Sequence, residues 1–185
     1  LNNTAVGRQA LDNNTTGSQN VAVGTNALDA NTTASNNTAV GEGSLKSNTT
    51  GTENTGVGFN ALAANTTGNY NTGLGQGALD SQTSASHNVA VGWNAGHVIT
   101  TGGNNVNIGN YAGDAIQSGG SNINVGYDAD CAHDSSNAIT IGVSITGSDN
   151  QFKFGKASNI VSNVFTTDAS WARSSDVNKK TNIED

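Results

Sequence analysis

A strict 17-residue repeat constrains the fold of this chain more than any other feature. A five-residue segment of the type Asn-Val-Ala-Val-Gly recurs eight times without a slip in spacing. Its first residue is Asn3, Asn20, Asn37, Asn54, Asn71, Asn88, Asn105 or Asn122, and its last is Gly7, Gly24, Gly41, Gly58, Gly75, Gly92, Gly109 or Gly126. Such a period predicts a solenoid in which each repeat forms one coil. A coil this short has no room for a helix, so we expect an all-β rod, roughly 40 Å long at normal strand spacing.

The composition agrees with a thin, regular core. Charged residues make up 11% of the chain, well below the usual quarter. Disordered chains also lack hydrophobic residues, but they are rich in Pro, Lys and Glu. Here Pro is absent, and Lys and Arg together number only 7 in 185 residues. The composition therefore favours an ordered repetitive fold.

Charge and composition also argue against several functions. The net charge of −7 offers no basic surface for nucleic acid or for an anionic membrane. No apolar run is long enough for a transmembrane helix. The single Cys131 cannot form an intrachain disulfide, and we expect it to be a small, partly buried residue. We expect no cofactor and no metal.

The five-residue motif alternates like a short strand. Its second and fourth positions are β-branched or aliphatic, and its third is small or an amide. We expect the second and fourth side chains to face the core. The small third position would then lie on the outer face, where another copy of the chain could pack closely.

A second short strand is expected at the Ala-Leu or Ser-Leu pair of each early coil. Its leucine column would fill the core, and it comprises Leu11, Leu28, Leu45, Leu62 and Leu79. Gly96, Gly113 and Asp130 replace leucine in the last coils. We expect Val98, Ile99, Ile116 or Tyr111 to fill the interior there.

The invariant Asn and Gly have structural interpretations. We expect the motif asparagines to stack into a ladder of side-chain amides that bonds neighbouring coils. We expect the motif glycines to adopt positive φ or to approach the next coil closely. The intervening segments, such as Asn13–Gly17, have turn composition.

The repeat slips after Gly126. The segment Asn137–Gly142 is a shifted copy of the motif, and the residues that follow alternate apolar and polar side chains with several aromatics. We therefore expect three parts. Residues 1–136 would form the solenoid of eight repeats, 137–173 a compact, intertwined β stem or cap, and 174–185 the start of a further, truncated domain.

The segments "NVAVGTNAL" (Asn20–Leu28) and "NVAVGWNAG" (Asn88–Gly96) resemble the heads of trimeric autotransporter adhesins. Those heads are left-handed parallel β-rolls built from "NxVAIGxxA"-like motifs, three side by side. Similar repeats occur in bacteriophage tail fibres. The resemblance implies a left-handed parallel β-roll and a homotrimer, with a longer turn because the 17-residue period exceeds the usual one.

The C-terminal segment "SSDVNKKTNIED" (Ser174–Asp185) resembles the opening of the endosialidase-type intramolecular chaperone domain of phage tailspikes and tail fibres. The matching residues are Ser175, Asp176, Lys180, Asn182 and Ile183. In that family the domain helps three chains assemble and then cuts itself off. The resemblance implies that Ser175 is the nucleophile and Lys180 its base, with scission after Ser174. We expect that the sequence ending at Asp185 cannot itself cleave.

Together these features predict a structural and host-receptor-binding segment of a trimeric phage tail fibre or tailspike, located in the virion and attaching to a cell-surface receptor. We expect that receptor to be a glycan. The alternative is the head of a bacterial surface adhesin. Variable turn positions are the candidate contact sites, and their aromatic members Phe59, Tyr70, Trp93 and Tyr127 could stack on sugar rings. The competing interpretation is that these aromatics cover a neighbouring chain or fill the space left by leucine.

The sequence gives little support for two further functions. A polysaccharide-degrading tailspike needs paired carboxylates, and only Asp128, Asp130, His133 and Asp134 form a local cluster, which we interpret as a loop. Recurring Thr pairs, such as Thr15 and Thr16, could bind ice, but neighbouring side chains on a strand point to opposite sides. We therefore expect no enzyme activity apart from the self-cleavage.

Overall fold

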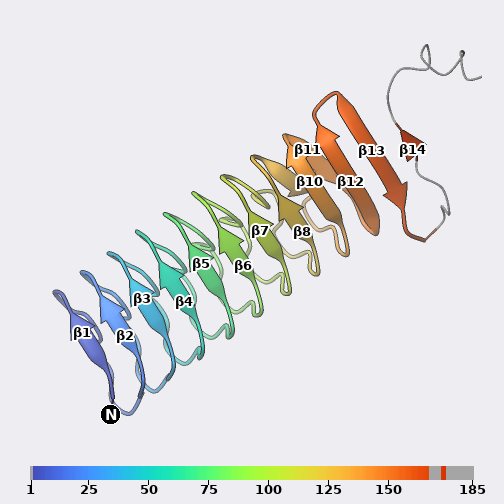
Figure 1. Cartoon of the computed structure of the whole chain (residues 1–185). Coiled ribbons are helices and arrows are strands. Elements are labelled where there is room, and N and C mark those ends of the chain that lie inside the picture. The colour runs from blue at the N-terminus through green and yellow to red at the C-terminus, as the bar shows by residue number, and fades with distance from the viewer. Residues whose placement is uncertain (1, 167–171, 174–185) are drawn as a thin grey trace, which may run out of the picture.

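The computed structural model of the chain describes residues 2–166 and 172–173. In this part the protein is all-β, a rod of about nine stacked coils (Figure 1). The eight repeats contribute one strand each: β1 (Thr4–Val6), β2 (Val21–Val23), β3 (Thr38–Val40), β4 (Thr55–Val57), β5 (Thr72–Leu74), β6 (Val89–Val91), β7 (Val106–Ile108) and β8 (Ile123–Val125). The expected β-solenoid of 17-residue coils is confirmed.

The eight repeat strands are parallel and pair in exact register with an offset of one repeat, so that Val6 lies beside Val23 and Val91 beside Ile108. The next strand, β10 (Ile139–Val143), also pairs in parallel with β8, but Ile139 lies beside Ile123 with an offset of 16 residues. The slip after Gly126 is thus one residue lost from a turn, while the stacking continues.

The C-terminal strands close the stack differently. Strand β12 (Gln151–Lys156) is parallel to β10 and forms an antiparallel hairpin with β13 (Asn159–Val164). Strand β14 (Ala172–Arg173) pairs with β13. A separate two-stranded sheet joins β9 (Ala129–Cys131) and β11 (Ile145–Gly147) on another side of the last coils.

The orientation predicted for the motif strand is wrong. The small third position faces inward, since Ala22, Ala39 and Ala90 are fully buried, whereas the aliphatic second and fourth positions face outward. The reason is that the coil is narrow. A Cβ built on Gly73 would lie 3.0 Å from the Ala78 carbonyl oxygen and 3.3 Å from Leu62 Cγ. In the coils with a leucine wall, only Ala or Gly therefore fits between the strand and that wall.

The second strand predicted in each repeat is also wrong, because the Ala-Leu pairs lie in turns. The leucines nevertheless fill the core as expected, and Leu28, Leu45, Leu62 and Leu79 are fully buried. Their φ angles of 50° to 56° are left-handed, which excludes a continuous strand. Burial of these large side chains offsets the conformational cost of that backbone.

The later coils replace leucine by a coordinated exchange of sizes. Ile99 and Ile116 are fully buried, as predicted, whereas Val98 and Tyr111 remain partly exposed. The inward strand position grows at the same time from Ala90 to Asn107. A Cβ on Gly113 would collide with the Asn107 side chain, so glycine in the leucine column makes room for that amide.

The predicted amide ladder is confirmed. Asn54 shows the pattern: its backbone N–H donates to Asn37 Oδ1 at 2.9 Å, its Nδ2 donates to the Gly68 carbonyl at 2.8 Å, and its Oδ1 accepts from Asn71 N–H at 3.0 Å. The ladder ends where Ala138 takes the asparagine position and donates its N–H to Asn122 Oδ1. Every rung thus bonds two coils in the buried interior.

A second ladder, not predicted, lies in the early coils. Asn48 Nδ2 donates both to Asn31 Oδ1 at 3.1 Å and to the Gly51 carbonyl at 2.9 Å, and Asn65 repeats the arrangement one coil later. The Gly51 carbonyl also accepts from Asn37 of the first ladder. The two ladders therefore converge on the same turn.

The motif glycines adopt φ between 129° and 138°, as expected. They also touch from coil to coil. A Cβ on Gly41 would lie 2.4 Å from the Gly58 carbonyl oxygen, which no side chain permits. This column therefore fixes glycine for both conformational and steric reasons.

Replacing Asn54 with Ala should destabilise the solenoid strongly. The change leaves the buried N–H of Asn71 without its acceptor, at about 1–3 kcal/mol, and removes one of the two amides that donate to the Gly68 carbonyl. We expect chemical denaturation to show a loss of about 2–5 kcal/mol. Thr50→Ala, at an exposed turn position, is the matched control and should change stability by less than about 0.5 kcal/mol. Equal effects of the two changes would contradict the role assigned to the ladder.

Candidate functional site

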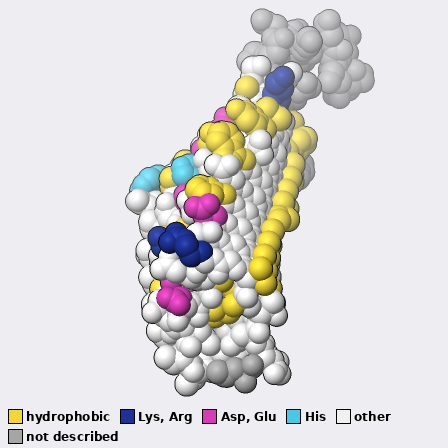
Figure 2. Space-filling model, turned by 90° about the vertical axis from the view of Figure 1, so that its left-hand side faces the viewer, with side chains coloured by type: hydrophobic (Ala, Val, Ile, Leu, Met, Phe, Trp, Pro, Cys, Tyr) yellow, Lys and Arg dark blue, Asp and Glu magenta, His cyan; other side chains and the backbone are white. Residues whose placement is uncertain are grey.

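The outer face of the sheet carries an unbroken line of apolar side chains, which we call the aliphatic stripe. It is formed by the fourth motif position and continues into the C-terminal strands: Val6, Val23, Val40, Val57, Leu74, Val91, Ile108, Val125, Ile141 and Phe154. Figure 2 shows it as a narrow hydrophobic line along the rod. Val6, Leu74, Ile108, Ile141 and Phe154 are all more than two-fifths exposed.

The stripe is flanked on the same face by the second motif position, which is Thr in four of the first five repeats and aliphatic in the later coils, at Val89, Val106, Ile123 and Ile139. The outer face therefore becomes more apolar toward the C-terminal coils. A contiguous apolar surface of this length is unusual on a soluble monomer and marks an interaction surface. Sequence reasoning missed it because these side chains were assigned to the core.

The four predicted contact aromatics are all exposed, but the structure does not bring them into one cluster. Phe59, Trp93 and Tyr127 share one column, directly after the motif glycine, at the end of the strands. Tyr70 lies before the motif asparagine, at the other end of the strands, and stacks on His87 with ring centroids 5.0 Å apart. Figure 2 shows large hydrophobic side chains beside the stripe, separated from it by a band of other residue types.

The turn near Trp93 holds a small aromatic cluster. Tyr111 from the next coil meets the Trp93 ring edge to face, with centroids 4.7 Å apart at an interplanar angle of 62°. The ring centroid of His97 lies 6.5 Å from that of Tyr111. Tyr111, one of the residues predicted to fill the interior, packs on this outer cluster instead, so that alternative is wrong.

The acidic and histidine cluster considered for catalysis is divided between the inside and the outside of the rod. Asp130 is 6% exposed and accepts from the Ala115 and Cys131 N–H groups at 2.7 and 2.8 Å. Its carboxyl is also hydrogen-bonded to Asp114. Burial, together with Asp114, raises the pKa of Asp130 to about 8. A carboxyl that is buried and bonded to backbone N–H groups in this way is not placed to flank a sugar, as a glycosidase pair must.

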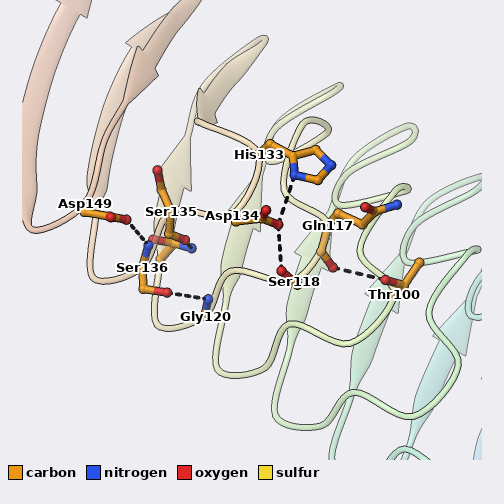
Figure 3. A network of polar contacts seen from close by, with 10 residues as sticks. Thr100, Gln117, Ser118, Gly120, His133, Asp134, Ser135, Ser136 and Asp149 are labelled. Atoms are coloured by element: carbon orange, nitrogen blue, oxygen red, sulfur yellow. Dashed lines mark hydrogen bonds and ion pairs between the residues drawn. The ribbon is translucent and has the colours of Figure 1, made fainter.

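His133 and Asp134 lie on the outer surface, next to Ser118 (Figure 3). Asp134 Oδ1 accepts from Ser118 Oγ at 2.6 Å and contacts His133 Nδ1 at 2.9 Å. The Ser118 hydrogen bond lowers the pKa of Asp134. The carboxylate stands between the serine and the histidine, whereas a nucleophilic triad needs the histidine in the middle to take the serine proton. The network therefore fastens two coils together.

Cys131 is fully buried and its thiol donates to Asn124 Oδ1 at 3.0 Å. Burial raises its pKa to about 11, so the thiol stays protonated and unreactive. In the described part of the chain, no three His, Cys, Asp or Glu side chains are placed to hold a metal ion. Residues 2–166 and 172–173 likewise include no helix with the length and hydropathy needed to cross a membrane.

The threonine column has a structural explanation. The hydroxyls of Thr15, Thr32 and Thr49 donate to backbone carbonyls of the following coil at 2.9 to 3.2 Å, and Thr66 repeats the bond. These hydroxyls are committed to the stacking of coils. The residues assigned to self-cleavage by resemblance, Ser175 and Lys180, lie outside the described residues.

Comparisons of the chain with protein-family models, with curated proteins and with solved structures found no match.

Because of Asp130, the free energy of unfolding should decrease as the pH rises from about 4 to about 8. Because its pKa is higher in the folded state than its ordinary 3.8, the folded protein binds the proton more tightly, and the stabilisation is lost as pH rises through the folded pKa. Asp130→Asn should flatten the dependence of Tm on pH across this range. Asp134→Asn, on the surface, should leave the decline in place. An unchanged decline in the Asp130 variant would contradict this assignment.

Proposed function

We propose that this chain is a structural and receptor-binding segment of a trimeric phage tail fibre or tailspike, in which the aliphatic stripe joins three copies side by side. The stripe is the observation that carries the proposal. It follows every coil from β1 to β10 as a continuous line of partly exposed aliphatic side chains. Full burial of an aliphatic side chain stabilises by about 1.5–3 kcal/mol. The stripe side chains are already partly buried in the single chain, so each would contribute part of that amount, and together they favour association.

The geometry of the stripe favours parallel association of complete rods. The strand register advances by one repeat without offset from β1 to β8, so the stripe is straight. Equivalent residues of neighbouring copies can then meet at equal height around a common axis, and a closed ring leaves no apolar edge exposed. The number three comes from the resemblance of the coil motif to trimeric adhesin heads.

Attachment to a receptor is the second part of the proposal. A rod whose interior and stripe are occupied by structural contacts leaves the turn columns for recognition. Phe59, Tyr70, Trp93 and Tyr127 are exposed there, and exposed aromatics without a structural requirement are typical of binding surfaces. We assign the receptor to the class of cell-surface glycans and the location to the virion.

A bacterial adhesin head is the second candidate, because the coil motif is shared by both settings. The C-terminal resemblance to a phage chaperone domain favours the fibre. An adhesin would instead continue into a coiled-coil stalk and a membrane anchor.

The double change Val57→Lys and Leu74→Lys should convert the assembly into monomers. The two lysines place six positive charges per trimer at the centre of the interface, where their burial is unfavourable. Light scattering should give three times the 18.6 kDa chain mass for the unchanged protein and one chain mass for the variant. Thr50→Lys with Thr67→Lys, on exposed turns, should stay trimeric. A monomeric unchanged protein would overturn the proposed assembly.

Maturation by self-cleavage can be tested on a longer protein that continues beyond Asp185. We expect scission between Ser174 and Ser175, detected by mass spectrometry of the two products. Ser175→Ala should abolish the cut because the nucleophile is lost, and Lys180→Met should slow it strongly because the base is lost. Cleavage at the same bond in the Ser175 variant would rule out the chaperone assignment.

A further inference from the structure

The column that follows the motif glycine has a regular pattern in the middle and later coils. From the fourth to the eighth coil it reads Phe59, Gln76, Trp93, Asn110, Tyr127. An aromatic residue thus occurs at every second coil, with an amide between. Phe59 is 48%, Trp93 43% and Tyr127 54% exposed, and both amides are exposed as well. No charged residue interrupts this run, which we call the aromatic column.

The spacing of the column is set by the solenoid. Strands β4 to β8 pair in parallel without any shift in register, so equivalent residues form a straight line. Successive coils are one strand spacing apart, which places the aromatics roughly 10 Å from one another. That distance is about the length of a disaccharide in an extended polysaccharide chain. Every second sugar could therefore meet an aromatic ring, and the sugars between could meet an amide.

The central aromatic is held in place by its neighbours. The edge-to-face contact with Tyr111 restricts the Trp93 indole. Asn110 Oδ1 accepts from the Trp93 backbone N–H at 3.4 Å, which positions the amide beside the ring with its NH₂ group as a donor. Restricting the side chains before binding lowers the entropic cost of recognition.

The surrounding charge selects the class of sugar. Glu42 occupies the same column one coil before Phe59, and Asp80 lies close enough to His97 to interact with it electrostatically. Within this column no Lys or Arg follows Phe59 up to Tyr127. An acidic polysaccharide would be repelled, whereas a neutral one needs only ring stacking and hydrogen bonds to its hydroxyls.

We propose that the aromatic column binds an extended, linear, neutral polysaccharide of hexopyranose units that lies parallel to the rod axis. The inference rests on the proposed attachment to a glycan and specifies its ligand and its site. All five residues of the column belong to one chain, so the site is complete without a partner copy. Tyr70, at the other end of the strands, is not part of it.

Binding is tested by titration with cellohexaose and chitohexaose, which are extended β-1,4-linked chains. Trp93 fluorescence in a Trp171→Phe background reports on the central ring, and calorimetry gives the affinity. We expect at least one of these hexasaccharides to bind at least ten-fold more tightly than its own disaccharide, because only the longer chain spans several aromatics. Maltohexaose, which is curved, and hexagalacturonate, which is acidic, should each bind at least ten-fold more weakly than that hexasaccharide.

Variants locate the site. Trp93→Ala should weaken hexasaccharide binding at least ten-fold by calorimetry, and Trp93→Phe should recover part of the loss. Tyr70→Ala is the matched control, an equally exposed aromatic outside the column, and should leave affinity within two-fold. The proposal is overturned if neither β-linked hexasaccharide binds, if maltohexaose or hexagalacturonate binds equally well, or if Trp93→Ala and Tyr70→Ala have equal effects.

The outcome is separable from that of the trimer. If the Val57→Lys, Leu74→Lys monomer still binds hexasaccharide, the column acts within one chain, as proposed. If it loses binding while retaining its fold by circular dichroism, the site depends on the assembly and the single-chain inference is wrong. A trimeric Trp93→Ala protein that no longer binds supports the column, whereas one that binds normally leaves the fibre role standing and removes this site.

Discussion

The structure depends on amides buried between successive coils. Each motif asparagine accepts a hydrogen bond from a backbone N–H of the next coil and donates one to a turn carbonyl. These groups are buried, so water cannot replace the asparagine as their partner. Buried polar groups are costly unless they are bonded, so the ladder fixes both the identity of the residue and the spacing of the coils. A repeat that gained or lost a residue within the strand would break the rung on either side. This explains why the period holds for eight coils and why the single residue lost after Gly126 comes from a turn.

Because the coils are narrow and stack closely, the small side chains of each strand face the core and the larger aliphatic ones face outward, the reverse of the usual arrangement. The coil interior holds one leucine or isoleucine layer and the ladder amides, so the strand can turn only alanine, glycine or a matched amide inward. The larger aliphatic residues are left outside. In a solitary globular domain this would be an unfavourable surface, but along a rod it produces a straight apolar line. The aliphatic stripe is therefore a direct consequence of a narrow core.

The period, the all-β class, the ladder and the positive φ of the motif glycines could be predicted because each depends on a residue type that recurs at every seventeenth position. Which side of the motif strand faces the core could not be predicted from the sequence. Alternation shows that two faces differ, but hydrophobicity alone assigned Val23 and Val91 to the core, and only the distance between Gly73 and the leucine wall decides otherwise. The leucine turns were missed for a related reason, since leucine seldom adopts the left-handed conformation seen at Leu45 and Leu62. The aromatic candidates were correctly placed on the surface, yet their alignment required the register.

A solenoid separates the positions that must repeat from those that are free to differ. The asparagine, glycine and inward positions are each fixed by contacts with the coils on both sides, so a substitution there disturbs its own coil and both neighbouring coils. The residue after the motif glycine points outward at the turn and can vary from Arg8 to Trp93 without altering the stack. Because each repeat adds one coil of constant rise, the residues in that column are separated by multiples of one strand spacing. In the proposed binding mode, an aromatic at every second coil would match a polymer whose own repeat is two sugars long.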